Sequence, residues 1–324
     1  MEYVFFDIEC ACVYKNVAKI CVFGYVVCDE KFNILKKEDI LINPNGKFHL
    51  TDRGGEGIVL PYDYEEFKKY PPFPYFYPKI KEILEGENKL VFGHAAVNDV
   101  KYLCLETGRY KLPSFKFTFA DTQVLYMAMT QTFDRQSGLE ALTQIFEVEY
   151  TPHCAADDAY ATMKVAQAMC EKENCTLSEL LIKLGIRSGK IADYRFSNCV
   201  SQSRNKYLSE KRKEKREKGE IRSKFNNFVL GYKERPKTRE LKGKRFCFAK
   251  DIEEDLSLAK NLVREIVSKG GKYVFKLSAC NVFVEREDDA SVRSETAHKM
   301  KEEGKIDEVY TLPEFQRLLG LEEA

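Results

Sequence analysis

Three short segments of the chain combine carboxylate or histidine side chains at spacings that could support chemistry. In the first segment, Asp7 and Glu9 follow a short apolar run, and alternate residues of a strand point to the same face. Two carboxylates held side by side repel each other unless a cation lies between them. The pair is therefore a candidate cation site, although a single pair at this spacing often occurs by chance.

The other two segments place an acidic residue at the start of a predicted helix. His94 and Asp99 lie in VFGHAAVND, where an apolar run leads into a helix whose first turn holds Asp99. His153 and Asp158 lie in HCAADDA, where a loop histidine precedes the start of a helix. Taken alone, Asp99 is an unremarkable residue for the start of a helix, and a single histidine such as His153 is more often structural than catalytic.

The apolar pattern around these segments predicts alternating strands and helices. Strands are predicted at residues 3–6, 20–27 and 89–92, and helical periodicity follows at 97–104 and 159–169. This alternation predicts an α/β layered domain that runs to about residue 184.

Beyond residue 184 the pattern changes twice. Residues 185–240 lose apolar periodicity and are predicted to form a linker, and order resumes over residues 241–324 as a second, small α/β domain. Between Arg204 and Arg245 about 17 Lys and Arg face about 6 Asp and Glu, whereas the whole chain has a net charge of +1. The predicted nucleic-acid contacts lie in this basic linker: Lys211, Arg212, Lys213, Lys215 and Arg216. The alternative is a solvent-exposed helix or a disordered segment without a ligand.

Composition excludes several classes of protein. A chain that is 44% hydrophobic and 32% charged can bury a core, so disorder throughout is excluded. No uncharged apolar run reaches about 18 residues, and the first ten residues lack a basic region, so neither a membrane helix nor a secretory signal is expected. Eleven cysteines without a CxxC pair make a zinc ribbon unexpected and favour free thiols in a reducing cytoplasm.

The order of the three segments is far more specific than any one of them. They read DxE, then H-x4-D, then H-x4-D-A, and this order resembles the DEDDh exonucleases, the 3′→5′ family that includes replicative proofreading subunits and RNase T. Further matches to that family are Asn43-Pro44, Asp121-Thr122 and Leu139–Leu142. The resemblance covers about residues 1–175 and implies an RNase H-like, three-layer exonuclease domain with a mixed sheet.

The resemblance implies a role for each matched residue. Asp7, Glu9, Asp99 and Asp158 would be the metal-binding carboxylates, and His153 would be the general base. Hydrolysis of a phosphodiester needs a hydroxide near neutral pH and relief of charge on the leaving oxygen, and two divalent cations can supply both. Hard oxygen ligands suit Mg²⁺ or Mn²⁺ rather than zinc. A neutral imidazole can accept the proton of the attacking water at pH 7–8.

Other residues of these motifs are expected to support the site or to alter its substrate contacts. His94, Asp121 and Asp157 are interpreted as structural, supporting or capping residues. The sequence departs from the family pattern at Cys10, Ala95 and Asn98. None of the three is a predicted ligand or the predicted base.

Residues 241–319 resemble a BRCT domain. The matches are Leu241-Lys242-Gly243-Lys244 before the first strand, Gly270-Gly271 after the first helix, and Glu314-Phe315 near the end. The resemblance implies a docking module for a protein or a DNA end. The expected organisation is an exonuclease domain at 1–184, a basic linker at 185–240 and a BRCT-like domain at 241–324.

Together these patterns predict a metal-dependent 3′→5′ exonuclease that hydrolyses phosphodiester bonds at the 3′ ends of single-stranded nucleic acid. DNA is the favoured substrate, with a role in replication or repair, and an exoribonuclease is the alternative because no motif reports contacts to a 2′-hydroxyl. A second class of function is a non-catalytic scaffold that binds nucleic acid or protein. The expected partners are single-stranded 3′ ends and no membrane.

Overall fold

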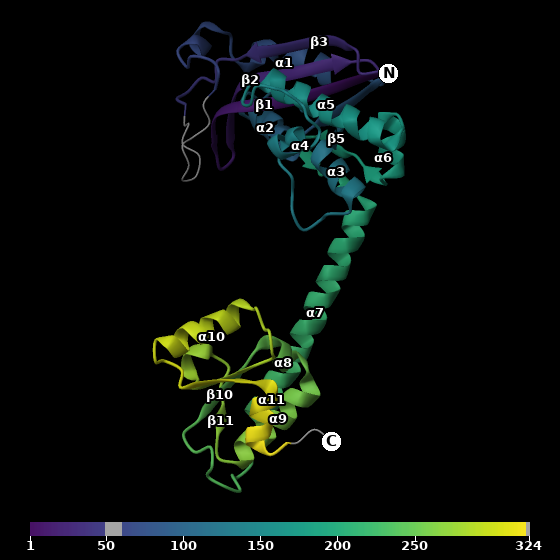
Figure 1. Cartoon of the computed structure of the whole chain (residues 1–324). Helices are drawn as coiled ribbons and strands as arrows, with labels where there is room; N and C mark the ends of the chain where they lie inside the picture. Colours follow the sequence, from purple (N-terminus) through teal and green to yellow (C-terminus); the bar gives the residue numbers. More distant parts are fainter. Residues whose placement is uncertain (49–59, 322–324) are drawn as a thin grey trace. The chain divides into compact units, whose positions relative to one another are not determined.

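The computed structural model describes residues 1–48 and 60–321 and divides the chain into two compact units (Figure 1). The first unit runs from Met1 to Ser209 and the second from Glu210 to Ala324. The boundaries expected from the sequence, at residues 184 and 240, fall inside the first and the second unit respectively. None of the helices in the described part of the chain is long and apolar enough to cross a lipid bilayer.

A seven-stranded mixed sheet forms the centre of the first unit (Figure 1). Its strand order is β3-β2-β1-β4-β5-β7-β8, in which β1 pairs in parallel with β4, and β4 with β5, while the other neighbours are antiparallel. The strands are β1 (Glu2–Tyr14), β2 (Val17–Cys28), β3 (Ile34–Leu41), β4 (Lys89–Gly93), β5 (Phe117–Asp121), β7 (Gly189–Ala192) and β8 (Arg195–Ser197). The strands predicted at 3–6, 20–27 and 89–92 are confirmed as β1, β2 and β4.

Helices and a small second sheet complete the first unit. The helices are η1 (Glu66–Lys69), α1 (Phe73–Leu84), α2 (Val97–Arg109), α3 (Thr122–Thr130), α4 (Leu139–Ile145), α5 (Ala155–Glu173) and α6 (Leu177–Lys183), and the small sheet pairs β6 (Ile186–Arg187) with β9 (Val200–Ser201). Of these, α5 packs on β1 and β2. Ala159, Met163 and Ala166 recur every three or four residues and are fully buried, so they form the face of α5 that the sheet covers. The helix ends at Asn174, whose φ of 48° is left-handed.

Glycine at position 24 lets α5 approach the sheet closely. Gly24 lies in β2, and a Cβ atom built on it would lie 2.1 Å from the carbonyl carbon of Ala155 and 2.2 Å from the amide nitrogen of Ala156. The N-terminus of α5 therefore rests directly on the backbone of β2, which only glycine permits. Since Asp158 lies in the first turn of α5, this contact sets how far Asp158 is from β1.

A four-stranded parallel sheet forms the centre of the second unit. Its order is β11-β10-β12-β13. The elements are α7 (Gln202–Gly231), which begins in the first unit, β10 (Arg245–Phe248), α8 (Lys250–Glu254), α9 (Leu256–Ser268), β11 (Lys272–Tyr273), η2 (Leu277–Ala279), β12 (Val282–Glu285), α10 (Val292–Glu302), β13 (Glu308–Thr311) and α11 (Leu312–Leu319). The basic stretch at 211–218, which could have been disordered, is helical. The BRCT-like assignment of this unit stays a prediction.

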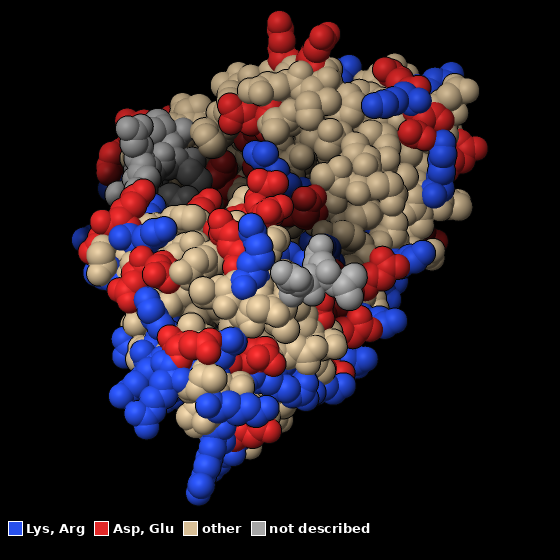
Figure 2. Space-filling model, turned by 60° about the horizontal axis from the view of Figure 1, so that its bottom comes forward, with Lys and Arg blue, Asp and Glu red and all other residues tan. Residues whose placement is uncertain are grey.

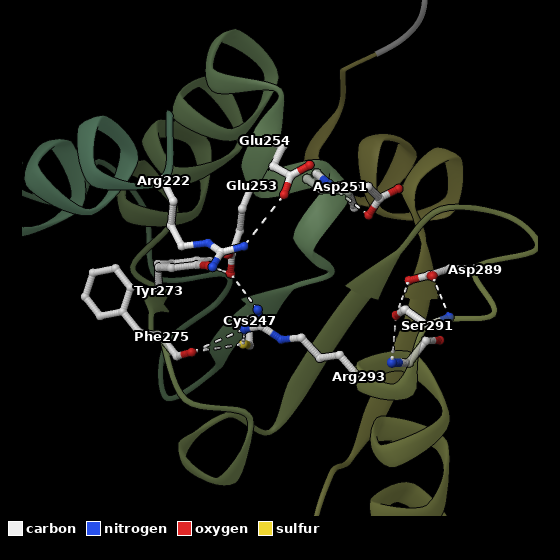
Figure 3. Close-up of polar contacts among 12 residues, drawn as sticks. Arg222, Cys247, Asp251, Glu253, Glu254, Tyr273, Phe275, Asp289, Ser291 and Arg293 are labelled. Atoms are coloured by element: carbon white, nitrogen blue, oxygen red, sulfur yellow. Dashed lines mark hydrogen bonds and ion pairs between the residues drawn. The ribbon is translucent and has the colours of Figure 1, made fainter. Parts of the chain in front are cut away.

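A buried polar network joins the helices of the second unit to its sheet (Figure 3). Glu253 of α8 is only 5% exposed, and its Oε1 lies 3.0 Å from Nη1 of Arg293 on α10. The hydroxyl of Tyr273 on β11 donates to the same oxygen at 2.8 Å. Nη2 of Arg293 donates to the sulfur of Cys247 on β10 at 2.8 Å and to the carbonyl of Phe275 at 3.2 Å. Because a buried carboxylate is costly without partners, this network fixes α8 and α10 on the sheet.

The contact at position 24 gives a testable prediction. Replacing Gly24 by Ala is expected to lower the free energy of unfolding by about 1–3 kcal/mol, because the added methyl group must displace the N-terminus of α5. Replacing Gly108 by Ala is the matched control, since nothing lies within 4 Å of a Cβ atom there. In urea unfolding of the full chain, equal midpoints for the Gly24→Ala and wild-type proteins would contradict the packing described here.

Candidate active site

The register of the first three strands brings two carboxylates to one place. Asp7 of β1 lies opposite Gly24 of β2, which in turn lies opposite Asp39 of β3. Residues opposite each other in an antiparallel pair project to the same face of the sheet, so Asp7 and Asp39 share a face across the gap that glycine leaves. Glu9 is two residues after Asp7 and shares that face as well.

The N-terminus of α5 enters this gap and brings Asp158. Ala155 and Ala156 cover Gly24, and the amide of Ala156 donates to Oδ1 of Asp39 at 2.8 Å. In this position one carboxylate oxygen each of Asp7, Glu9 and Asp158 can be chosen so that all three atoms lie within 4.8 Å of one another. Residues that lie about 150 positions apart in the sequence are thus close enough to share one cation.

Asp99 lies in the first turn of α2, after the turn that follows β4; it is not one of the three residues whose oxygens lie within 4.8 Å, but the charges of Asp7 and Glu9 act on it. Ala95 adopts a left-handed φ of 52°, and both oxygens of Asp121 hold this turn, accepting from the amides of Ala95 at 3.0 Å and Ala96 at 3.1 Å. Asp121 also accepts from the amide of Gln123 at 2.9 Å and so caps α3, which confirms that it is a supporting residue. The side chain of Asp99 is buried at 6% exposure.

His94 has a structural environment. Its Nδ1 is 3.0 Å from the hydroxyl of Thr122, and its Nε2 is 3.1 Å from the carbonyl oxygen of Ser137. Burial lowers the pKa of His94 to about 4, so the ring is neutral near pH 7. The imidazole therefore ties β4 to α3 and to the loop before α4.

Burial and like charge raise the pKa of all four matched carboxylates. The pKa of Glu9 rises to about 7, first through burial and then through the charges of Asp158 and Asp39. Burial and the charge of Asp7 raise the pKa of Asp158 to about 8. Asp7 and Asp99 also have raised pKa values, with burial as the largest cause, followed by the charge of Glu9 on Asp7 and the charge of Asp7 on Asp99.

This donor set fits divalent cations. It consists of carboxylate oxygens, which are hard ligands. In the part of the chain that the structure describes, no Lys, Arg or His forms an ion pair with any of the four carboxylates. The described protein cations therefore do not compensate their charge, and a bound divalent cation would do so.

His153 lies on the loop that leads into α5. Its side chain is exposed, its φ is 64°, and its backbone amide donates to the carboxylate of Asp158, which opposes the rise in the pKa of that residue. No hydrogen bond joins the imidazole to another described residue. The structure therefore fixes the backbone of His153 next to the carboxylates and leaves the ring to solvent.

Asp157 and Asp39 differ in what the sequence could reveal. Asp157 forms an ion pair with Lys37 of β3, whereas Asp158 belongs to the carboxylate group.

Asp39 was missed by sequence reasoning. Besides Ala156 it accepts from the hydroxyl of Tyr62 at 2.5 Å and from the thiol of Cys154 at 3.3 Å. Only the register of β3 on β2 reveals Asp39, and an exposed, charged strand carries little signal for its register.

The predicted nucleic-acid contacts lie on the exposed surface of α7. Lys211 pairs with Glu214, Lys213 with Glu217, and Arg216 with Glu220, at distances of 3.7–3.9 Å. For Arg212 and Lys215 the structure gives no ion pair with a described residue. The assignment of these five residues to nucleic acid stays a prediction.

A family model and several solved structures are similar to parts of this chain. A family model described as exonuclease, RNase T, matches residues 4–166. A similar solved structure is a full-length 3′-exonuclease, with 16% identity and a TM-score of 0.48 over 62% of this chain and 91% of that chain. Another is E. coli exonuclease I in complex with a dT13 oligonucleotide, with 16% identity and a TM-score of 0.42 over 53% of this chain and 42% of that chain. A third is the cell-death related nuclease 4, with 13% identity and a TM-score of 0.42 over 53% of this chain and 64% of that chain.

No curated protein matches the chain. The chain aligns with less than half of the exonuclease I chain. The matched family region, residues 4–166, makes up half of the sequence and contains Asp7, Glu9, Asp99, His153 and Asp158. Five of the seven strands of the mixed sheet expected for an RNase H-like nuclease, β1 to β5, lie in essentially the same region. The chain therefore belongs to the RNase T family of exonucleases.

Proposed function

We propose that this exonuclease depends on divalent metal ions and removes nucleotides from the 3′ ends of single-stranded nucleic acid. The observation that carries the proposal is the partly buried group of carboxylates, in which oxygens of Asp7, Glu9 and Asp158 lie within 4.8 Å of one another and form no ion pair with a described Lys, Arg or His. A scaffold that only binds nucleic acid would have no use for such repulsion. Repulsion between these carboxylates instead favours a site that binds cations.

Asp7, Glu9, Asp99 and Asp158 would hold Mg²⁺ or Mn²⁺. When bound, two such ions supply an activated water and neutralise charge on the leaving oxygen. The remaining tasks belong to the protein. Hydrogen bonds from the α5 N-terminus to Asp39, and from the turn before α2 to Asp121, hold the carboxylates in place before substrate arrives.

We propose that His153 is the general base that accepts the proton of the attacking water. A general base must come within hydrogen-bond reach of that water, and the exposed imidazole beside Asp158 is unengaged by other described residues. The backbone amide of His153 donates to Asp158, a proposed metal ligand, and this hydrogen bond keeps His153 near the metal site, which supports the role of base.

Single-stranded DNA is the substrate that we propose, in replication or repair, with RNA as the second candidate. The resemblance to proofreading subunits favours DNA, whereas the similarity to RNase T keeps RNA in consideration. The discriminating group is the 2′-hydroxyl, which is absent from DNA. Matched DNA and RNA oligonucleotides therefore separate the two candidates directly.

Polarity is the first prediction from this proposal. A single-stranded oligonucleotide labelled at its 5′ end should shorten progressively in Mg²⁺, and the same strand with a covalently blocked 3′ end should resist. The DNA strand should be digested faster than the RNA strand. Cleavage of a circular single strand as fast as a linear one would contradict the exonuclease assignment.

A neighbouring pair of acids provides the control for that assay. Asp158→Asn should abolish digestion, because it removes a carboxylate from the proposed metal site. Asp157→Asn should retain most of the activity, since its carboxylate pairs with Lys37 instead. Equal activity of the two purified variants would overturn the proposed function.

The role of His153 gives a second prediction. His153→Ala should lower kcat by about 10²–10⁴, the usual contribution of a positioned base. The kcat of the wild type should rise with pH along a limb that the variant lacks, and Mg²⁺ affinity should stay the same because the four carboxylates remain. If the variant keeps the wild-type rate and the same pH limb, His153 is not the base.

The raised pKa values give a third prediction. Folded-state pKa values of about 7 for Glu9 and about 8 for Asp158 lie above those of an unfolded chain. The folded protein therefore binds these protons more tightly, and the resulting stability is complete below about pH 4 and lost as the pH rises through 7 and 8.

Without divalent ions the melting temperature should accordingly fall between about pH 6 and about pH 8.5. Mg²⁺ should raise the melting temperature more at the higher pH, where the carboxylates are ionised. Asp158→Asn should show a smaller difference between the two pH values than the wild type. A Mg²⁺ effect that is independent of pH in the wild type would contradict the predicted coupling.

A further inference from the structure

Two segments of the second unit concentrate positive charge. Residues 232–245, between α7 and β10, contain seven Lys and Arg and two Glu, and residues 269–276, after α9, contain three Lys. We call these ten residues the basic face: Lys233, Arg235, Lys237, Arg239, Lys242, Lys244, Arg245, Lys269, Lys272 and Lys276.

Backbone contacts join the two segments into one surface. The amides of Lys237 and Thr238 donate to the carbonyl of Ser268 at 2.7 Å and 3.1 Å. The amide of Lys272 donates to the carbonyl of Lys244 at 3.0 Å, where β11 pairs with β10. Gly270, with a φ of +84°, allows the two segments to lie in contact, since a Cβ atom there would lie 3.1 Å from the carbonyl oxygen of Thr238. The fold itself therefore brings the two basic segments together.

Few carboxylates compensate this charge. Lys269 pairs with Glu240 at 2.8 Å, and Lys244 lies 3.8 Å from Asp307 and 3.5 Å from Glu308. The other eight cations are exposed, and the structure gives none of them an ion pair with a described residue. The position of Lys269 at the C-terminus of α9 also favours a cation, but this explains only one of the ten.

The exposed surface of α7 differs from the basic face in this respect. Its cations alternate with acids at helical spacing, as in the pairs Lys213–Glu217, Arg216–Glu220 and Lys218–Glu214. α7 carries ten Lys and Arg against four Glu and is positive as well, but several of its cations pair with Glu, whereas eight of the ten cations of the basic face form no ion pair with a described residue. Figure 2, turned so that the bottom of Figure 1 comes forward, shows Lys and Arg gathered over the lower part of the view.

We propose that the basic face binds the phosphate backbone of a nucleic acid. Exposed like charges held together repel one another, and a polyanion with regularly spaced phosphates relieves that repulsion and releases its own counterions. A protein partner fits less well, because Lys is depleted in protein interfaces. Phe275, which is 39% exposed beside Lys276, offers a ring on which a base can stack.

This contact is separate from the carboxylate site. It lies in the second unit and needs no divalent ion, since phosphates bind Lys and Arg directly. Binding can therefore be measured in the presence of EDTA, where digestion is stopped. The inference and the proposed function can then succeed or fail independently.

The test uses the full chain and a fluorescent single-stranded DNA oligonucleotide in EDTA over a series of salt concentrations. The variant Arg239→Gln/Lys242→Gln/Lys272→Gln removes three cations without touching a buried side chain. Its affinity at low salt should fall at least about tenfold, and the slope of log affinity against log salt should become shallower by about 2, at about 0.7 per phosphate contact. The control Lys299→Gln/Lys301→Gln/Lys305→Gln removes three exposed cations of the α10 region and should bind like the wild type.

Three outcomes decide between the possibilities. Loss of affinity in the first variant alone supports the inference, even if the wild type shows no nuclease activity in Mg²⁺. Equal affinity and salt slope in both variants overturn it, even if the wild type digests DNA. Binding to vesicles of phosphatidylserine in place of the oligonucleotide, lost in the first variant, also overturns it and assigns the face to a membrane.

Discussion

Repulsion among carboxylates is the constraint on which the first unit depends. Asp7, Glu9, Asp99 and Asp158 are brought from three separate elements into a site where burial opposes their ionisation. Left alone, such a group would spread apart or take up protons. The surrounding hydrogen bonds therefore do more than stabilise helices, because they hold in place a group that would otherwise separate.

Two further acids, Asp39 and Asp121, accept the hydrogen bonds that hold the four carboxylates in place. Asp39 holds the amide of Ala156 at the start of α5, and Asp121 holds the amides of Ala95 and Ala96 before α2. Both use backbone donors at helix N-termini, where carboxylates are favoured. The four matched carboxylates and the two acids that position them, Asp39 and Asp121, are therefore different residues.

Much of the site could be predicted from the sequence, because its residues lie in local patterns. The DxE pair, the two H-x4-D segments and the strands around them can be read without any tertiary contact. Asp39 and Gly24 could not be identified in this way, because their roles arise from the register of β3 on β2 and from the approach of α5. The short strands β7 and β8 at one end of the sheet were missed because they bury too few residues to leave a periodic pattern.

The separation of the site residues along the chain has a consequence for synthesis of the protein. Asp7 emerges from the ribosome early, Asp99 follows, and Asp158 arrives only when α5 has been made and has packed on β2. Domains fold as units during translation, and a chain that ends before residue 158 holds at most three of the four acids. The nascent chain therefore has no complete carboxylate site until α5 has been made and has packed on β2.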